Sequence, residues 1–374
     1  MQLALGGQQL GLILLAGCAA GVYVASRSAV DALAGPRHTA DGTPEPPSPG
    51  RRAIGHFLPV AAMALLALFY GYPDVTVGVI FATSVASLAL VAGLVLLLSH
   101  AAEQSPTPLR RTWAFILPVA ALALLAGFSG QLTPFHAEVL LMEGLVIFLL
   151  WLGRPKSEAP PSATAAVVTD PPPRLHPRKL LIRAVELILA LALAVLAAWA
   201  GTRGVIHVSQ TSRMVSPALL AVSTLSPLLT LPMISGGLNL GGRGHASAAL
   251  TSAVGVTLLN LCLLLPLVIG LWYGLPEIAP RLAPWVQIAD AAPSTQPATT
   301  AATRASPPSP PEVKPLPFPL AAWRIDTVVL AALGLLLIPA AVGRWELGRG
   351  EGLGLVIGYA IYLAASTILG LRWG

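Results

Sequence analysis

Apolar runs about as long as a bilayer is thick recur along this chain of 374 residues. A helix needs about 20 apolar residues to cross ~30 Å of hydrocarbon, and the run from Leu187 to Ala200 contains no charge. Only helices and closed barrels satisfy their backbone in lipid, and these continuous runs lack the alternation of barrel strands. Charged residues make up 10% of the chain, against roughly a quarter in soluble domains. The sequence therefore predicts an all-α polytopic membrane protein.

Ten spans are predicted, joined in three places by long connections. The spans cover residues 8–26, 53–70, 75–98, 113–128, 136–153, 180–200, 214–240, 246–273, 323–342 and 352–371. The connections 34–52, 155–178 and 275–322 are rich in Pro, Ala, Ser and Thr. Because such segments cannot bury enough apolar surface to fold, we expect disordered or extended linkers.

Basic residues in the loops predict how the spans are oriented. With the N-terminus outside, fifteen of the 22 Lys and Arg residues fall in inside loops, including the pair Arg110-Arg111 in a short loop. The positive-inside rule therefore predicts that both termini lie outside and that the central linker 155–178 is cytoplasmic. We expect an integral protein of a bacterial inner membrane. The net charge of +6 is spread thinly over the loops, so no nucleic-acid partner is predicted.

The residues that carry enzyme chemistry are scattered or missing. Cys18 and Cys262 both lie in apolar runs, and the seven histidines form no H-E-x-x-H motif. The sequence Leu15-Ala16-Gly17-Cys18 looks like a lipobox, but no Lys or Arg precedes it as a signal peptide requires. We predict no enzyme activity, no cofactor, no disulfide and no resident metal ion.

The chain aligns with itself when it is shifted by 173 residues. Leu58-Pro59 then meets Leu231-Pro232, and twelve residues after each proline comes a glycine, Gly71 or Gly244. We expect a first repeat at 1–154 and a second at 179–374, with five spans each. Because five is odd, the second repeat enters the membrane from the opposite side. Inverted repeats with interrupted helices at matched positions are typical of secondary transporters, whose site lies between the repeats.

At these residues the chain resembles the sodium/calcium exchanger superfamily, the cation/calcium antiporters. Each half of such a protein carries a G-T-S-L-P-E helix, a tight turn and a G-N-x-x-G-S-N helix. The first repeat here reads GHFLPV at 55–60, GYPD at 71–74 and GVIFATS at 78–84. The second reads LTLPM at 229–233, GHA at 244–246 and TSAVGVT at 251–257, followed by Asn260. The resemblance implies the exchanger fold for nearly all the membrane part and for none of the linkers.

The departures from that pattern fall on the residues that would bind calcium. The resemblance places a calcium-ligating glutamate at Val60 in one repeat and at Met233 in the other. The asparagines of the motif correspond to Val79 and Ser84 in the first repeat, and to Ser252 and Thr257 in the second. Ca²⁺ prefers about six to eight oxygen ligands, with carboxylates supplying the charge. We therefore expect no calcium site of the exchanger type.

Polar residues nevertheless remain at the expected centre. The candidate ion or substrate path is His56, Val60, Thr83, Ser84, Thr230, Met233, Ser252, Thr257 and Asn260, with Ser87 and Ser235 close by. They could line a small polar cavity that passes a monovalent cation, a proton or a small neutral solute. Alternatively, they could hydrogen-bond between packed helices, as Ser, Thr and Asn often do in membranes.

Ionisable residues in the spans also have two interpretations. His56 could relay protons, but Arg51 and Arg52 precede it, which slightly favours a place at the cytoplasmic interface. We expect the acidic residues near span ends to be interfacial or paired with arginine; they are Glu138, Glu143, Glu186, Asp326 and Glu351.

Two functions follow from this pattern. The first is a secondary cation transporter of the exchanger fold with altered or lost calcium specificity. The second is a transport-inactive membrane scaffold of the same fold, with the outside linker 275–322 as the segment that docks a partner protein.

Overall fold

The computed structural model describes residues 2–34, 48–98, 131–152, 177–212, 215–274, 316–317, 320–341 and 348–373. Each predicted span that falls in these ranges coincides with a helix, which confirms a polytopic all-α architecture. Seven of the described helical stretches are long and apolar enough to cross a membrane. The predicted span 113–128 and most of the three predicted linkers lie outside the described residues.

The first half of the chain begins with two helices, α1 (Gln2–Ala34) and α2 (Pro49–Phe69). A continuous helical stretch follows, made of α3 (Pro73–Val85), the π-helical segment η1 (Ala86–Val91) and α4 (Ala92–Leu98). The last described helix of this half is α7 (Pro134–Leu152).

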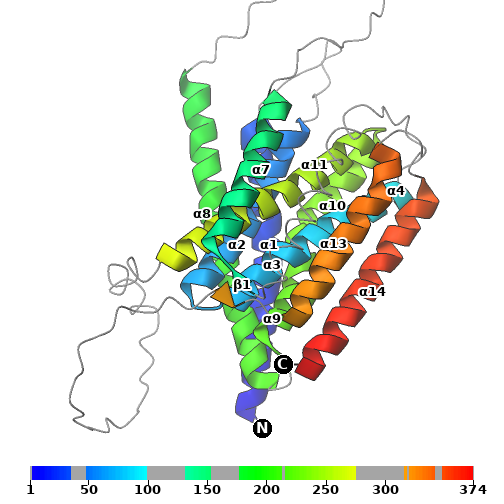
Figure 1. The fold of residues 1–374 in the computed structure, drawn as a ribbon. Helices are drawn as coiled ribbons and strands as arrows, with labels where there is room; N and C mark the ends of the chain where they lie inside the picture. The colour runs from blue at the N-terminus through cyan, green and yellow to red at the C-terminus, as the bar shows by residue number, and fades with distance from the viewer. Residues whose placement is uncertain are drawn as a thin grey trace, which may run out of the picture.

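The second half begins with α8 (Pro177–Ser212). A second interrupted stretch consists of α9 (Pro217–Leu220), the π-helical η2 (Ala221–Leu225) and α10 (Ser226–Gly242). A third consists of α11 (Ala246–Leu259), the π-helical η3 (Asn260–Leu264) and helical residues 265–274. The chain ends with α13 (Leu320–Ala341) and α14 (Arg349–Trp373), which lie side by side in orange and red in Figure 1.

Two tight turns 173 residues apart have the same backbone geometry. Gly71, between α2 and α3, has φ +78°, and Gly244, between α10 and α11, has φ +81°. Glycine suits these positions because it has no Cβ to oppose a positive φ. The Tyr72 N–H donates to the Ala67 carbonyl over 2.9 Å, and the His245 N–H donates to the Leu240 carbonyl over 2.8 Å. Both helices thus end in the same Schellman-type turn.

Two of the three described π-helical segments, η1 and η3, repeat with nearly the same spacing. In each half the helix that follows the glycine turn becomes π-helical after about four turns, in η1 and in η3. A π-turn inserts one extra residue per turn and changes which side chains face a neighbouring helix, and such turns are frequent at functional sites. The local geometry therefore repeats along the chain, whereas the opposite membrane orientation of the two halves stays a prediction.

Small residues let the outer helices approach the core closely. Where α1 packs along α8, a Cβ added to Gly21 would lie 2.8 Å from the Ala197 Cβ. Where α14 crosses α4, a Cβ added to Gly352 would lie 2.8 Å from the Gly93 carbonyl oxygen. Helix interfaces in membranes are enriched in such residues. Lipid is as apolar as the side chains, so the hydrophobic effect does not hold helices together there, and close backbone packing does instead.

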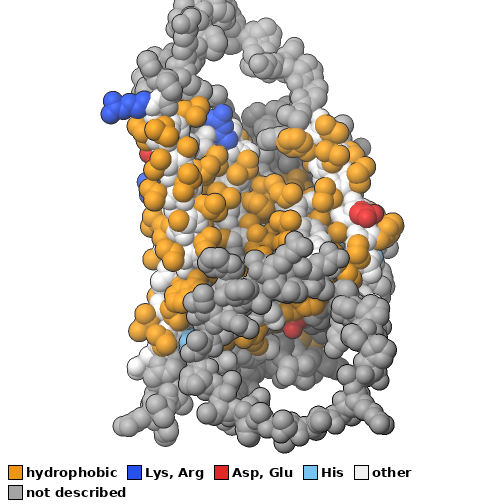
Figure 2. Space-filling model, turned by 90° about the vertical axis from the view of Figure 1, so that its left-hand side faces the viewer, with side chains coloured by type: hydrophobic (Ala, Val, Ile, Leu, Met, Phe, Trp, Pro, Cys, Tyr) orange, Lys and Arg blue, Asp and Glu red, His pale blue; other side chains and the backbone are white. Residues whose placement is uncertain are grey.

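The outer surface is suited to lipid. On α8, the side chains of Ile188, Leu189 and Leu196 are 64%, 63% and 63% exposed. Figure 2 shows hydrophobic side chains forming a broad band on one face, with Lys and Arg side chains near its upper end. An apolar surface of this extent is a liability in water, but it is the surface that a bilayer solvates.

One short strand pair revises the prediction for the linker 275–322. Strand β1 (Gln131–Leu132) pairs antiparallel with β2 (Leu316–Pro317), so that Leu132 lies opposite Leu316. Both leucines are buried, and the Tyr273 hydroxyl donates to the Leu132 carbonyl over 2.9 Å. The last residues of this linker are therefore ordered by pairing, while 275–315 lie outside the described part of the chain.

Candidate functional site

Four of the predicted path residues meet where α3 packs against α11 and η3. Asn260, the first residue of η3, donates from Nδ2 to the Thr83 Oγ1 over 3.1 Å and to the Ser84 Oγ over 3.2 Å. The Thr257 hydroxyl donates to the Ser84 carbonyl over 3.4 Å. All four residues are fully buried. We call Thr83, Ser84, Thr257 and Asn260 the central polar cluster.

The donor directions within the central polar cluster are consistent. The Thr83 hydroxyl donates to the Val79 carbonyl over 2.5 Å, and the Ser84 hydroxyl donates to the Ile80 carbonyl over 2.7 Å. Such bonds to the carbonyl four residues earlier use the one hydroxyl proton. The hydroxyl oxygens can then only accept, which fixes the Asn260 amide with its NH₂ group toward them.

Two buried oxygens of the predicted path residues have no hydrogen-bond partner among the described residues. They are Asn260 Oδ1 and Ser252 Oγ. Buried polar atoms in folded proteins normally have a partner, so an open acceptor calls for an explanation such as water or an ion. Neutral oxygens of this kind can accept from water or bind a monovalent cation, but they carry no charge to balance one.

The positions of the missing glutamates are filled by apolar packing. Val60 of α2 and Met233 of α10 are buried in the hydrophobic core, as is Val79 of α3. Met233 is linked to the site through the Ser87 hydroxyl, which lies 3.7 Å from its sulfur. Among the described residues, therefore, no carboxylate stands at either position where the resemblance would place a calcium ligand.

His56 is buried between helices, while its expected place at the cytoplasmic interface stays a prediction. Its Nδ1 lies 2.6 Å from the Ser26 Oγ, so the ring bridges α2 and α1. Thr230 bonds within α10, to the carbonyls of Ser226 and Pro227. No hydrogen bond among the described residues joins His56, Thr230 or Ser252 to the central polar cluster.

Arg52 is a buried charge that sequence reasoning treated only as a marker of topology. It lies one turn before His56 on α2, and a Cβ added to Gly236 of α10 would lie 2.8 Å from its Nη2. Asp31 of α1 is near enough to interact with it electrostatically. Gly236 has no side chain, and this leaves room for the Arg52 guanidinium between α2 and α10. The glycine is the one sequence signal of this packing.

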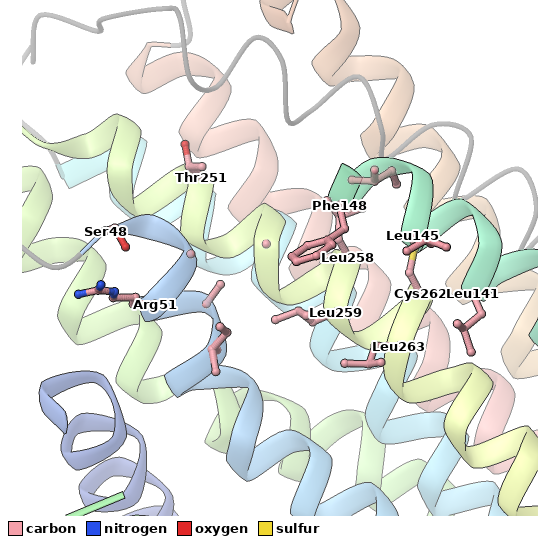
Figure 3. Close-up of a pocket in the computed structure, with 16 residues that line it drawn as sticks. Ser48, Arg51, Leu141, Leu145, Phe148, Thr251, Leu258, Leu259, Cys262 and Leu263 are labelled. Carbon is pink, nitrogen blue, oxygen red and sulfur yellow. The ribbon is translucent and has the colours of Figure 1, made fainter. Parts of the chain in front are cut away.

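A separate cavity of about 630 Å³ lies between the start of α2, α7 and the α11–η3 stretch. Figure 3 shows Leu258, Leu259 and Leu263 along one side and Phe148 of α7 across from them, with Arg51 and Ser48 at one end. None of the nine predicted path residues lines it. The cavity is therefore an apolar space beside the central polar cluster and not a polar path through it.

Comparison with known proteins identifies the fold. No protein-family model matches the sequence, and no curated protein matches it significantly. Among solved structures, the chain is similar to those of cation exchangers. The H⁺/Ca²⁺ exchanger CAX matches with a TM-score of 0.61 and 14% identity, over 99% of this chain and 87% of that one. The fold is thus that of a polytopic cation exchanger.

Two further structures support the same fold. The sodium-calcium exchanger NCX_Mj matches with a TM-score of 0.55 and 16% identity, over 97% of this chain and 98% of that one. The structure of native YfkE matches with a TM-score of 0.58 and 14% identity, over 96% of this chain and 91% of that one. The exchanger fold predicted from the repeat is therefore confirmed, at identities too low to transfer a substrate.

Proposed function

We propose that this chain is a secondary transporter of the exchanger fold that moves a monovalent cation or a proton and not Ca²⁺. The fold supports transport, because CAX and NCX_Mj, with which this chain aligns over nearly its whole length, are ion exchangers. The observation that carries the proposal is the central polar cluster, where Asn260 joins the two interrupted helices and leaves its Oδ1 open.

Electrostatics oppose a divalent substrate. Ca²⁺ is bound through carboxylates, yet Val60 and Met233 stand where the resemblance places them. The hydroxyl and amide oxygens of the central polar cluster are neutral. The helix that carries Val60, α2, also carries a buried positive charge, the guanidinium of Arg52. Dehydrating a divalent ion at such a site would cost far more than a few neutral oxygens return.

Flux into proteoliposomes tests the proposal. Purified protein should move Na⁺, K⁺ or H⁺ down an imposed gradient, and Ca²⁺ should not move. Ser252→Leu, which replaces an open acceptor with a bulky apolar side chain, should abolish the flux. Thr367→Val is the matched control, because among the described residues the Thr367 hydroxyl bonds to the Leu363 carbonyl of its own helix and to no other helix. Wild-type protein that moves none of the four cations under any gradient would refute transport.

The alternative, a transport-inactive scaffold, is favoured by one specific observation. The side chains of Val60, Val79 and Met233 are packed into the apolar core, and the cavity in Figure 3 is lined mainly by apolar residues. A scaffold should keep its role when Ser252 or Ser84 is replaced and lose it when residues 275–315 are deleted. A partner that co-purifies only with the full-length chain would support this function, and flux through the wild-type protein would exclude it.

A double substitution distinguishes loss of the calcium ligands from loss of the binding geometry around them. Val60→Glu together with Met233→Glu returns a carboxylate to each repeat. Calcium binding by this variant, measured by isothermal titration in detergent, would show that the binding geometry survives and that only the ligands were lost. The variant Val60→Gln with Met233→Gln is the uncharged control and should bind no calcium.

A further inference from the structure

A buried carboxyl lies outside the central polar cluster, on α13. Asp326 comes six residues after the helix begins and is 4% exposed. The Tyr362 hydroxyl of α14 donates to its Oδ1 over 2.7 Å, and Tyr362 is itself buried. Among the described residues the hydrogen-bond partner of Asp326 is thus a tyrosine. The expected interfacial place or arginine pairing stays a prediction, because the side chain of Arg324 lies outside the described part of the chain.

The polar surroundings continue from α14 toward α10. Tyr359 lies one turn before Tyr362 on α14, and the two ring centroids are 5.9 Å apart. The Tyr359 hydroxyl is near enough to Ser226 of α10 to interact with it. Neither hydroxyl, however, has a partner with regular hydrogen-bond geometry among the described residues. Two buried polar side chains thus stand unsatisfied next to the Asp326–Tyr362 pair.

No positive charge offsets an ionised Asp326 within the described structure. Its own helix packs most closely on α14 and α3. The groups that α14 presents are the phenols of Tyr359 and Tyr362, and α3 carries one titratable residue, Asp74, which is exposed at its start. A carboxylate buried with a single hydrogen bond is costly, whereas the neutral acid is far less so. The charge of this group therefore depends on whether a proton is bound.

We propose that Asp326 and Tyr362 form a proton-binding site inside the membrane, separate from the central polar cluster. Proton uptake converts the carboxylate to a neutral acid, and Tyr362 keeps its own proton throughout. In the ionised state the Tyr362 O–H donates to Oδ1; in the neutral state the acid gains an O–H that can donate in turn. The site does not depend on transport by the central polar cluster.

Infrared difference spectroscopy tests the site directly. Protein in lipid nanodiscs is shifted between acidic and alkaline buffer, and the carbonyl stretch of protonated carboxyl groups is recorded. The wild-type spectrum should contain a band that exchanges slowly in D₂O and that is lost in Asp326→Asn. Asp74→Asn is the matched control and should keep this band, because Asp74 is exposed.

Tyr362→Phe keeps the test decisive if Asp326→Asn does not fold. Removing the phenol hydroxyl deletes the hydrogen bond that the carboxyl receives within the described part of the chain, so the band should shift in frequency and its pH midpoint should move. A spectrum of Asp326→Asn that matches the wild type would overturn the proposal. A folded Tyr362→Phe whose band keeps its frequency and midpoint would overturn it equally.

Discussion

Asn260 links the α11–η3 stretch to α3 through one amide group. Its Nδ2 reaches both Thr83 and Ser84, whose own protons are used within α3. Because the first residue of η3 carries this amide, the bonds fix the register of the π-turn against α3. A hydrogen bond between helices in a membrane contributes about 0.6 kcal/mol on average and up to about 1.7.

Asn260→Leu should therefore lower the stability of the folded protein by about 1–2 kcal/mol. The side chain keeps nearly the same shape, and the Thr83 and Ser84 hydroxyls keep their own acceptors. The loss is then that of two donated bonds, offset in part by removal of the open Oδ1. Thermal unfolding in detergent measures it. Thr257→Val is the milder comparison, because it removes one proton shared between the Ser84 carbonyl of α3 and the Ala253 carbonyl of its own helix. An Asn260→Leu variant as stable as the wild type would show that the amide is not structural.

The central polar cluster could be predicted from sequence because the repeat and the resemblance place Thr83, Ser84, Thr257 and Asn260 at matched positions. Their hydrogen bonds could not, since these depend on how the π-turn rotates Asn260 toward α3. The burial of Arg52, His56 and Asp326 could not be predicted for one reason. Each lies within two turns of a helix start, where distance along the chain indicates an interface but says nothing of the neighbouring helix that buries it.

At the scale of elements, helix positions follow from hydropathy and turns from glycine. The reversal at Gly71 and at Gly244 could be predicted because only glycine adopts the required φ easily. The π-helical segments were not predicted, since a single extra residue in one turn leaves no mark on an apolar sequence. The pairing of β1 with β2 was also missed, because two residues are too few for an alternating pattern.

The crossing of α14 over α4 depends on the absence of a side chain at Gly352. An added Cβ would lie 2.7 Å from the Leu97 amide nitrogen and 2.8 Å from the Gly93 carbonyl oxygen. Since both atoms belong to backbone, neither can rotate away. Gly352→Val should separate the helices and destabilise the protein by about 1–3 kcal/mol or more.

Gly354→Val is the matched control for this crossing. It places the same residue on the same helix, where an added Cβ meets nothing within 4 Å. Thermal unfolding in detergent should show a large decrease for the first variant and a small one for the second. Equal decreases would mean that helix propensity, and not the crossing, is responsible.

At the scale of the whole molecule, the inverted arrangement predicts that the two glycine turns face opposite sides of the membrane. The shared geometry shows that the two turns are corresponding positions of the two halves. If the halves had the same orientation in the membrane, both turns would lie on the same side. Loop charges assign the Gly71 turn to the outside and the Gly244 turn, beside Arg243, to the inside. Asp74 and His245 are exposed near these turns, and the native Cys18 and Cys262 are buried, so single introduced cysteines can report each side.

In intact cells, a membrane-impermeant maleimide should label Asp74→Cys and should label His245→Cys only after lysis. Background labelling should be low, since burial shields both native thiols. If His245→Cys is labelled in intact cells and Asp74→Cys only after lysis, the two turns still lie on opposite sides. The repeat would then be inverted as predicted, but the N-terminus would lie inside. Labelling of both variants from one side would contradict the inverted repeat itself, and with it the placement of a transport site between two oppositely oriented halves.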